Sequence, residues 1–517
     1  MSDRIPILIA GAGPAGLVLA YSLARQGAPF RIVDPKSGPV SESRAMGVQA
    51  RTLEFYDQFG IADEAIALGV PASRAHLRSG GREVTSFSLE EMGEGISPHP
   101  FMLCLAQDVH ERFLVEKLKE LGVAIEWGTR LDGFERDGEG VTAALSGPNG
   151  GETVRADWIV GCEGARSVVR RGLDLAFEGG TNEGLFYVAD IDVEGHDAGS
   201  PDAEAGRILA SLDETTVALM MPVRTSGTQR VLGIVPRDLA DRAARTGSEL
   251  TWEGIRHVPE AALGIRATAL HWFSTYKVSH RVAEHFRVGR AFLAGDAGHI
   301  HSPVGGQGMN TGIGDAVNLG WKLAAVVRGR ADASLLDSYE PERIAFARKL
   351  ISTTDEAFGP MASNSFMSRM LRAYIAPNAA RVLLHLPWLP QLLFRTVSQT
   401  RINYRESALS AGEAGDVRGG DRMPWAREAA NFAPLASLRW QVHVHGSAEP
   451  ALGEAARALG LAVETFKWSA GAKRAGLARD AAYLVRPDGY VALALPNQEA
   501  AALRDHVAAC GLRLEAS

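Results

Sequence analysis

The stretch Gly11-Ala12-Gly13-Pro14-Ala15-Gly16 decides the fold class of this chain. The apolar run Ile5–Ala10 precedes it and has the length and composition of a buried strand. Ala15–Gln26 then shows helical periodicity, and Phe30–Asp34 reads as a second strand. A strand, a crossover helix and a second strand form a βαβ unit, in which the two strands are parallel. The sequence therefore predicts an α/β fold that opens with a parallel sheet.

The three glycines of this stretch fit the G-x-G-x-x-G fingerprint of dinucleotide-binding folds. The first glycine makes the turn, the second lets a pyrophosphate approach the backbone, and the third lets helix and strand pack closely. The helix N-terminus offers N–H groups and its positive dipole end to phosphates. An acid about 20 residues further on accepts the ribose hydroxyls. The alternative is a tight turn without a ligand, and the motif alone does not separate FAD from NAD. The residues expected to bind are Gly11, Gly13, Pro14, Ala15, Gly16 and Asp34.

Composition and charge narrow the class of protein. A chain of 517 residues is too long for one ordinary core, so several compact units are expected. The net charge of −7, without a block of like charge, argues against a nucleic-acid partner. The three cysteines lie far apart, without metal-ligand or redox spacing, which favours a cytoplasmic, thiol-reduced protein.

Two apolar stretches could be mistaken for membrane segments. Ile5–Ala24 contains the glycines and the proline of the opening motif, which favour a strand, turn and helix over a signal peptide. Val382–Phe394 is interrupted by His385, Pro387 and Pro390, which argues against a span. No membrane partner is expected.

The pattern of apolar and polar residues changes between Glu183 and Ser279. Alternating runs there, such as Leu185–Val193 and Val231–Val235, predict an antiparallel sheet inserted between two parts of the first domain. The predicted organisation is a Rossmann-like domain (1–182 and 280–360), an inserted β-sheet substrate domain (183–279, with 72–104 contributing), a helical segment (361–406), a linker (407–432) and a C-terminal domain (433–517).

A second motif begins at Gly289 and ends at Asn310. Its apolar strand delivers Asp296 at the carboxyl end, where ligands of open α/β sheets collect. Glycines at 305, 306 and 308 let the backbone lie against a flat ligand, and a helix is expected from about Thr311. The dipole of that helix would favour negative charge on a reduced isoalloxazine.

This motif resembles the signature of the FAD-dependent aromatic hydroxylases of the p-hydroxybenzoate hydroxylase type. The similarity runs from Gly295-Asp296-Ala297 through Asp315-Ala316 to Trp321-Lys322-Leu323, with Gly298 where the family usually has alanine. The resemblance implies that Asp296 contacts the ribityl–pyrophosphate of FAD and that Pro303 lies beside the reacting face of the flavin. It also implies that the pyrimidine end is held by Gly306, Gly308, Met309 and Asn310.

Further pieces occur in the family's order. Arg44 and Gln107 match family residues near FAD. Glu163 and Arg166 match, more weakly, a motif associated with FAD and NAD(P)H, in which Glu163 replaces an aspartate. A structural ion pair between the two is the alternative interpretation.

Substrate contacts and a catalytic base are less well defined. Gln49, Met220, Pro222 and Trp272 are the candidates for lining a substrate cavity, and at least half of the apolar candidates are expected to be ordinary core. No base is identified. His271, Tyr276, His280 and His299 lie in the right region, but a structural role is favoured for each. A metal site at His299 and His301 is not expected, because no third ligand is in view.

The C-terminal domain resembles the thioredoxin-like domain of many family members, most clearly in Val485-Arg486-Pro487-Asp488-Gly489-Tyr490-Val491-Ala492. Cys510 is its only cysteine, so packing or oligomerisation is favoured over a redox role. A monomer or a homodimer is expected.

The resemblance implies a monooxygenase that uses NADPH or NADH, FAD and O2. By that resemblance a flavin C4a-hydroperoxide transfers oxygen to a phenolic or polycyclic aromatic substrate, and the protein supplies orientation and a dry site. Baeyer–Villiger oxidation, a flavin-dependent reductase and a non-catalytic FAD-binding partner remain alternatives.

Overall fold

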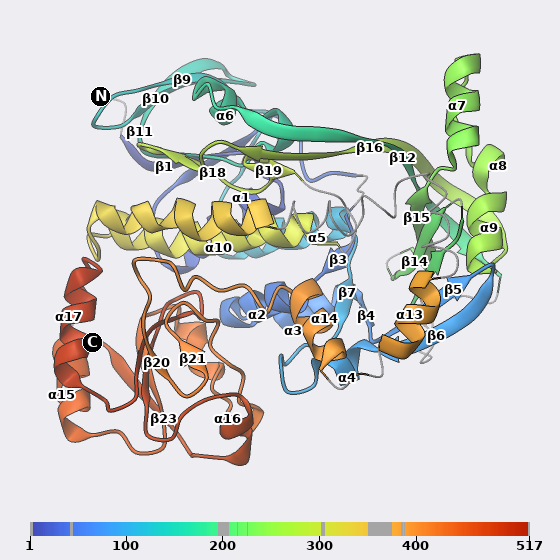
Figure 1. Cartoon of the computed structure of the whole chain (residues 1–517). Helices are drawn as coiled ribbons and strands as arrows, with labels where there is room; N and C mark the ends of the chain where they lie inside the picture. Colours follow the sequence, from blue (N-terminus) through green and yellow to red (C-terminus); the bar gives the residue numbers. More distant parts are fainter. Residues whose placement is uncertain are drawn as a thin grey trace.

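The computed structural model describes residues 4–41, 45–194, 206–214, 216–224, 226–300, 306–349, 375–383, 386 and 388–514. Three principal sheets organise these residues, and the long helix α10 (Gly308–Val327) runs between the first sheet and the C-terminal part of the chain (Figure 1). Within the described part of the chain, no helix is both long enough and apolar enough to cross a bilayer.

The first sheet is built on the βαβ unit that the sequence predicts. Strand β1 (Ile5–Ala10) pairs in parallel with β2 (Arg31–Asp34) and with β11 (Gly150–Gly161), because its continuous apolar run is buried on both faces. The strand order is β17-β18-β11-β1-β2-β8, with β10 paired to β11 and β9 paired to β10. The remaining strands are β8 (Glu126–Trp127), β9 (Arg130–Arg136), β10 (Val141–Gly147), β17 (Arg287–Val288) and β18 (Ala291–Leu293).

Helices α1 (Pro14–Arg25), α5 (Gln107–Glu120) and α10 lie along this sheet (Figure 1). Helix α10 begins three residues before the position predicted from the sequence. A small sheet of β3 (Gly47–Val48), β7 (Met102–Cys104) and β4 (Val70–Ala72) lies beside α2 (Ala50–Phe59), α3 (Ala62–Leu68) and α4 (Leu89–Gly93). The motif residues of the cofactor site lie on the strand ends and helix starts of this domain.

The second sheet is antiparallel apart from one strand pair, with the order β19-β16-β12-β15-β14-β13-β5-β6. Strands β12 (Phe177–Val193) and β16 (Ala267–Ala283) are long and antiparallel; β12 begins and β16 ends beside the first sheet, so both strands connect that sheet to the far end of the second (Figure 1). The shorter strands are β5 (Arg74–Ser79), β6 (Arg82–Ser88), β13 (Arg207–Leu212), β14 (Val217–Val223), β15 (Thr228–Ile234) and β19 (His299–Ile300).

The two faces of the second sheet pack against different layers. Tyr187, Ala189 and Val231 share a core with Trp252 and Leu263 of the short helices. The short helices outside this face are α7 (Arg237–Thr246), α8 (Trp252–Ile255) and α9 (His257–Leu263). Because side chains alternate along a strand, the intervening residues occupy the opposite face, and there Met221 and Val223 join the core of the first domain.

The C-terminal sheet has the order β21-β20-β25-β24-β22-β23. Residues 407–432, expected as a linker, contain β20 (Ala411–Ala414) and β21 (Val417–Arg418), and β20 pairs in parallel with β25 (Val491–Leu495). That expectation is therefore corrected: glycine and alanine give this segment little intrinsic strand propensity, and pairing with a distant edge supplies its structure. The other elements are β22 (Gln441–His445), α15 (Pro450–Ala458), β23 (Ala462–Phe466), α16 (Ala470–Arg474), β24 (Ala482–Val485) and α17 (Ala500–Ala509).

The C-terminal domain shares a hydrophobic core with α10. Trp321 of α10 meets Trp440 edge to face, with ring centroids 5.6 Å apart, and Leu335 joins the same cluster. Residues 339–349 are helical and run beside this contact. Part of the segment expected to be helical, 361–374, lies outside the described residues; α13 (Ala376–Leu383) and α14 (Leu389–Val397) are the described helices after it.

Candidate FAD-binding site

The glycine-rich turn between β1 and α1 has the close contacts that its spacing predicts. Gly11 has a φ of +103°, and a Cβ there would come within 2.4 Å of the carbonyl oxygen of Cys162. A Cβ on Gly16 would lie 1.9 Å from the carbonyl oxygen of Gly11. Gly13 differs, because no heavy atom lies within 4 Å of the position its Cβ would take. The turn is therefore tightly packed at the first and third glycines and open at the second.

The open glycine lies at the N-terminus of α1. Gly13 is the N-cap residue and Pro14 occupies the first turn, and no side chain caps the helix. The N–H groups of that first turn are available to an anion, and the helix dipole favours negative charge there. Asp34 lies beneath the turn, where its Oδ2 accepts the Ala12 N–H at 2.6 Å and its Oδ1 accepts the Lys36 N–H at 2.8 Å. Asp34 therefore also fixes the shape of the turn.

The second motif packs directly on the first. Gly295 has a φ of +62°, and a Cβ there would lie 3.0 Å from the Cβ of Ala15. A Cβ on Gly312 would lie 3.0 Å from the Cα of Gly295. Two segments almost 300 residues apart thus bring the N-termini of α1 and α10 together beside the turn Gly295–Ala297.

Asp296 projects from this turn. It is exposed, whereas Gly295 and Ala297 on either side of it are buried. Desolvation by the surrounding protein raises the pKa of its carboxyl above the ordinary value, and His299 only partly opposes that effect. This exposed carboxyl lies in the turn beside the N-termini of α1 and α10.

The N-terminus of α10 is the second uncapped helix end. The helix starts at Gly308, after Gln307, and no side chain caps it. The Asn310 side chain is buried and bound on every side. Its Nδ2 donates to the carbonyls of Gly47 (2.8 Å) and Gly306 (2.6 Å), and its Oδ1 accepts from the Gln49 N–H (2.9 Å) and the Thr52 hydroxyl (2.7 Å). Asn310 therefore secures the loop, which leaves the backbone of Gly308 and Met309 as the groups able to meet a flavin.

A buried ionic group supports both turns. Asp315 accepts the Gly295 N–H at 3.0 Å, contacts His299 Nε2 at 2.7 Å and accepts from Arg343 Nε at 2.6 Å. Burial would raise the pKa of Asp315, but Arg343 and His299 outweigh it and leave the pKa below the ordinary value. His299 is 1% exposed and is a structural partner of Asp315. Arg343 was missed by the sequence analysis, because a charged residue within a helix carries no motif.

The residues expected near FAD also include Gln107, Arg44 and Pro303. Gln107 Nε2 donates to Glu111 Oε1 at 2.8 Å, and Glu111 Oε2 accepts the Val40 N–H at 3.0 Å. Gln107 thus belongs to a bonded group at the start of α5. Arg44, Pro303 and His301 lie outside the described residues.

Glu163 caps a helix. It accepts from the Ser167 hydroxyl at 2.7 Å and from the Val169 N–H at 3.0 Å, at the start of α6 (Val168–Gly172). Arg166 is exposed, and no ion pair joins it to Glu163 within the described residues. The expected alternative of an ion pair between the two is therefore wrong, although Glu163 does support the turn through other partners.

The candidates for substrate contact and for the base are dispersed. Met220 belongs to the core beneath α8 and α9, so its side chain points away from the first domain. Pro222 shares that face by alternation. Gln49 is buried, with its side chain 3.6 Å from the Met102 sulfur. Trp272 lies on the opposite face, with the Arg230 guanidinium 5.6 Å from its ring centre.

The remaining base candidates lie on β16. His271 is half exposed and pairs with Asp192 at 3.0 Å. Tyr276 stacks on Phe186 with ring centroids 5.9 Å apart, and His280 lies opposite Gly180 in the strand pair. The described residues contain no group of three or more His, Cys, Asp or Glu side chains placed to hold a metal.

The comparisons with known proteins agree with this geometry. A family model described as FAD binding domain matches residues 4–354. The chain is 34% identical over 355 residues to 12-dehydrotetracycline 5-monooxygenase/anhydrotetracycline 6-monooxygenase from Streptomyces rimosus subsp. rimosus, covering 68% of this chain and 69% of that protein. It is 36% identical over 385 residues to 6-methylpretetramide 4-monooxygenase from Streptomyces rimosus, covering 74% of this chain and 65% of that protein. The match thus spans slightly less than two thirds of the latter.

Similarity in structure extends over the whole chain. The solved structure of OxyS anhydrotetracycline hydroxylase from Streptomyces rimosus superposes with a TM-score of 0.76 at 28% identity and covers 100% of both chains. The chain belongs to the FAD-binding domain family. Within that family it is a member of the FAD-dependent aromatic hydroxylases of the phenol and polyketide type, which confirms the resemblance read from the sequence and identifies FAD as the cofactor.

Proposed function

We propose that this protein is an FAD-dependent monooxygenase that uses NADPH or NADH and O2 to hydroxylate a phenolic or polycyclic aromatic substrate. The observation that carries the proposal is the convergence of two uncapped helix N-termini, those of α1 and α10, beside Gly295 and Asp296. The three similar proteins reported above are named as monooxygenases or hydroxylases of 6-methylpretetramide, 12-dehydrotetracycline or anhydrotetracycline, which supports the proposal.

The residues present fit FAD. The open space at Gly13 and the amides of Ala15 and Gly16 would take the pyrophosphate, with Asp34 beside the ribose. Asp296 would face the ribityl chain, and the first turn of α10 would face the pyrimidine end of the ring, where its dipole favours negative charge. When bound, FAD supplies the electron transfer and oxygen chemistry that side chains lack.

We assign the substrate to the sheet face that turns toward the first domain. By alternation this face carries Phe186, Tyr276 and Trp272, together with Met221 in place of the predicted Met220. Aromatic and thioether side chains suit a flat apolar substrate. Arg230 forms a bidentate pair with Asp190 at 2.7 Å on both arms, beneath the Trp272 ring. This pair neutralises both charges, so the face presents rings more than charge.

The C-terminal domain is proposed to be thioredoxin-like. Its strands follow the order β25-β24-β22-β23, with α15 between the parallel strands and α17 after the hairpin, which supports this assignment. Burial raises the pKa of Cys510 to about 11, so the thiol stays protonated. A packing role therefore fits better than a redox role. We place the protein in the cytoplasm, as a monomer or a homodimer.

The test measures NADPH and NADH oxidation under air with a panel of phenols and polycyclic phenolic ketones. Hydroxylation predicts substrate-stimulated oxidation and a product heavier by one oxygen atom, which heavy-isotope O2 labels. A labelled lactone or ester would instead select Baeyer–Villiger oxidation. A reduced, unlabelled product would select a reductase. Protein that is yellow with FAD but shows no stimulated oxidation with any compound would support a non-catalytic FAD-binding partner.

A further inference from the structure

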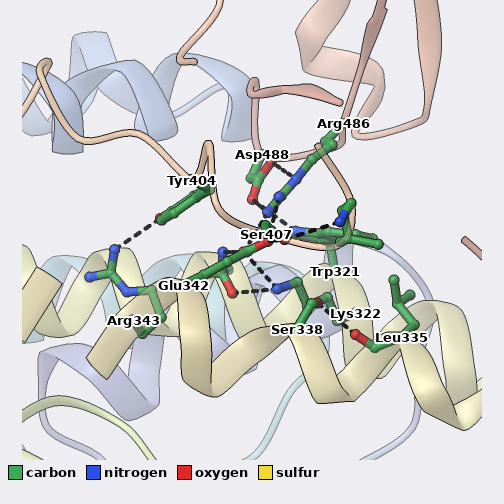
Figure 2. Close-up of polar contacts among 12 residues, drawn as sticks. Trp321, Lys322, Leu335, Ser338, Glu342, Arg343, Tyr404, Ser407, Arg486 and Asp488 are labelled. Atoms are coloured by element: carbon green, nitrogen blue, oxygen red, sulfur yellow. Dashed lines mark hydrogen bonds and ion pairs between the residues drawn. The ribbon is translucent and has the colours of Figure 1, made fainter. Parts of the chain in front are cut away.

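A buried carboxylate joins the C-terminal domain to the helices of the first domain (Figure 2). Glu342 lies in the helical residues 339–349, and its side chain has no exposed surface. Its two oxygens accept five hydrogen bonds, from Arg486 Nη1 (2.8 Å) and Nη2 (3.0 Å), Lys322 Nζ (2.8 Å), Asn318 Nδ2 (2.6 Å) and the Ser407 hydroxyl (2.6 Å). Arg486 comes from the C-terminal domain, and Asn318 and Lys322 come from α10.

The charges in this cluster balance. Arg486 also holds Asp488, at 3.0 Å through Nε and 2.6 Å through Nη2, and Asp488 accepts the Trp321 indole N–H at 2.9 Å. Two carboxylates therefore face one guanidinium and one ammonium in a volume without water-exposed surface. Burial alone would raise the pKa of Glu342, but Arg486 and Lys322 lower it below the ordinary value. The pairing tolerates little displacement, because a buried charge that loses its partner is costly.

One path leads from this cluster to the proposed flavin site. Arg343, next to Glu342, donates to Asp315 at 2.6 Å and to the Thr311 carbonyl at 3.0 Å. It thus holds both the Gly295 turn, through Asp315, and the first turns of α10. The Nη1 of Arg343 donates to the Tyr404 hydroxyl at 2.9 Å. The Tyr404 ring packs on Tyr490, with ring centroids 4.3 Å apart.

A second path leads through α2. The Asp488 carbonyl accepts from Arg51 Nη2 at 2.8 Å. Arg51 also pairs with Glu54 at 2.8 Å, and Glu54 accepts both arms of Arg422 at 2.8 and 2.5 Å. At the start of the same helix, the Gln49 N–H and the Thr52 hydroxyl bind Asn310. Helix α2 is therefore held at two places, by the C-terminal part of the chain and by Asn310 at the proposed flavin site.

We propose that the turn Arg486–Tyr490 of the C-terminal domain, here called the positioning turn, is a positioning element for FAD. The side chains of Arg486, Asp488 and Tyr490 in this turn contact the helix that carries Arg343, α10 and α2, respectively. Each of these three helices supports part of the site. The inference rests on the placement of FAD given under Proposed function. It assigns the C-terminal domain a role in cofactor binding that needs no redox cysteine. Apolar packing alone could join two domains, whereas this network specifies one relative arrangement.

The decisive variant removes one hydroxyl. Tyr404→Phe deletes the hydrogen bond to Arg343 and keeps the ring against Tyr490. The matched control is Tyr483→Phe in the C-terminal domain, where the buried hydroxyl accepts the Ala478 N–H at 2.8 Å and donates to the Ala414 carbonyl at 3.0 Å, away from the first domain. Both variants are expected to lower the urea midpoint. Tyr404→Phe alone is expected to raise the Kd for FAD, by about 2- to 30-fold, and to change the visible circular dichroism of the bound flavin.

Two further variants separate the possible failures. Gly13→Val is expected to fold, because the space beyond its Cα is open, and to lose FAD; normal FAD binding by this variant would overturn the placement of the cofactor. Arg486→Lys keeps the charge but cannot bridge Glu342 and Asp488, so it should weaken FAD binding at least as much as Tyr404→Phe. The positioning role is overturned if Gly13→Val loses FAD while Tyr404→Phe and Tyr483→Phe give equal Kd values, with the bound-flavin spectrum unchanged.

Discussion

Replacing Glu342 by glutamine tests how strongly the stability of the buried cluster depends on the Glu342 carboxylate. The shape of the side chain is kept, but one acceptor oxygen becomes an NH2 donor. In either orientation at least two of the five donors then face another donor, and Arg486 and Lys322 lose the charge that balances them. Breaking a buried pair in this way costs about 3–5 kcal/mol. Glu126→Gln is the matched control, because Arg31 holds Glu126 with two bonds of 2.7 and 2.6 Å in a partly exposed place and the expected cost is only about 0–1 kcal/mol.

Hydrogen exchange measured by mass spectrometry gives this loss of stability for individual segments of the chain. In Glu342→Gln, peptides from 339–349 and from β24–β25 should lose roughly 10²- to 10⁴-fold in protection, because about 1.4 kcal/mol corresponds to a factor of ten. Glu126→Gln should lose about fivefold or less around β2 and β8. Equal losses in the two variants would refute the reasoning. The folded-state pKa of Glu342 is lowered, so its contribution is fully present above the ordinary glutamate pKa of about 4.3 and is lost as the pH falls below that value. The difference between wild type and variant should shrink accordingly.

Three other predictions follow from single residues. Gly16→Ala should abolish FAD binding, seen as loss of flavin absorbance after purification, because its Cβ would overlap the Gly11 carbonyl; Gly133→Ala, which meets no atom within 4 Å, should retain FAD. His443 is buried and its pKa is lowered to about 3, so its contribution to stability is complete above about pH 6.5 and falls at lower pH by up to about 1.4 kcal/mol per pH unit. His443→Gln should flatten the loss of urea midpoint on acidification, and an unchanged slope would contradict this. Cys510→Ser should leave turnover within about twofold of wild type; a large loss would restore the redox interpretation of its domain.

Local patterns were sufficient for the elements that carry the cofactor motifs. Strand β1 has the predicted bounds, and α1 and β2 differ from prediction by one residue at one or both ends. The reason is that glycine spacing, apolar runs and helical periodicity each act over a few residues. The close contacts at Gly11 and Gly16 also follow from the motif, because its first glycine makes the turn and its third lets helix and strand pack closely.

The tertiary structure alone decided which face of a strand is covered and which element lies beside it. Alternation shows that Met220 and Met221 point to opposite sides of β14, but it does not show that the helices α8 and α9 cover the side of Met220. Strand β20 forms because β25 lies beside it, not because its own residues favour a strand.

The same distinction holds for the charged residues behind the site. Glu342 and Arg343 look like ordinary surface charges on a helix, and Arg486 lies more than 140 residues away from them in the chain. Their partners meet only when the C-terminal domain docks on α10. Short-range patterns therefore identified the cofactor, whereas the three-dimensional packing of distant segments determined which side chains support it.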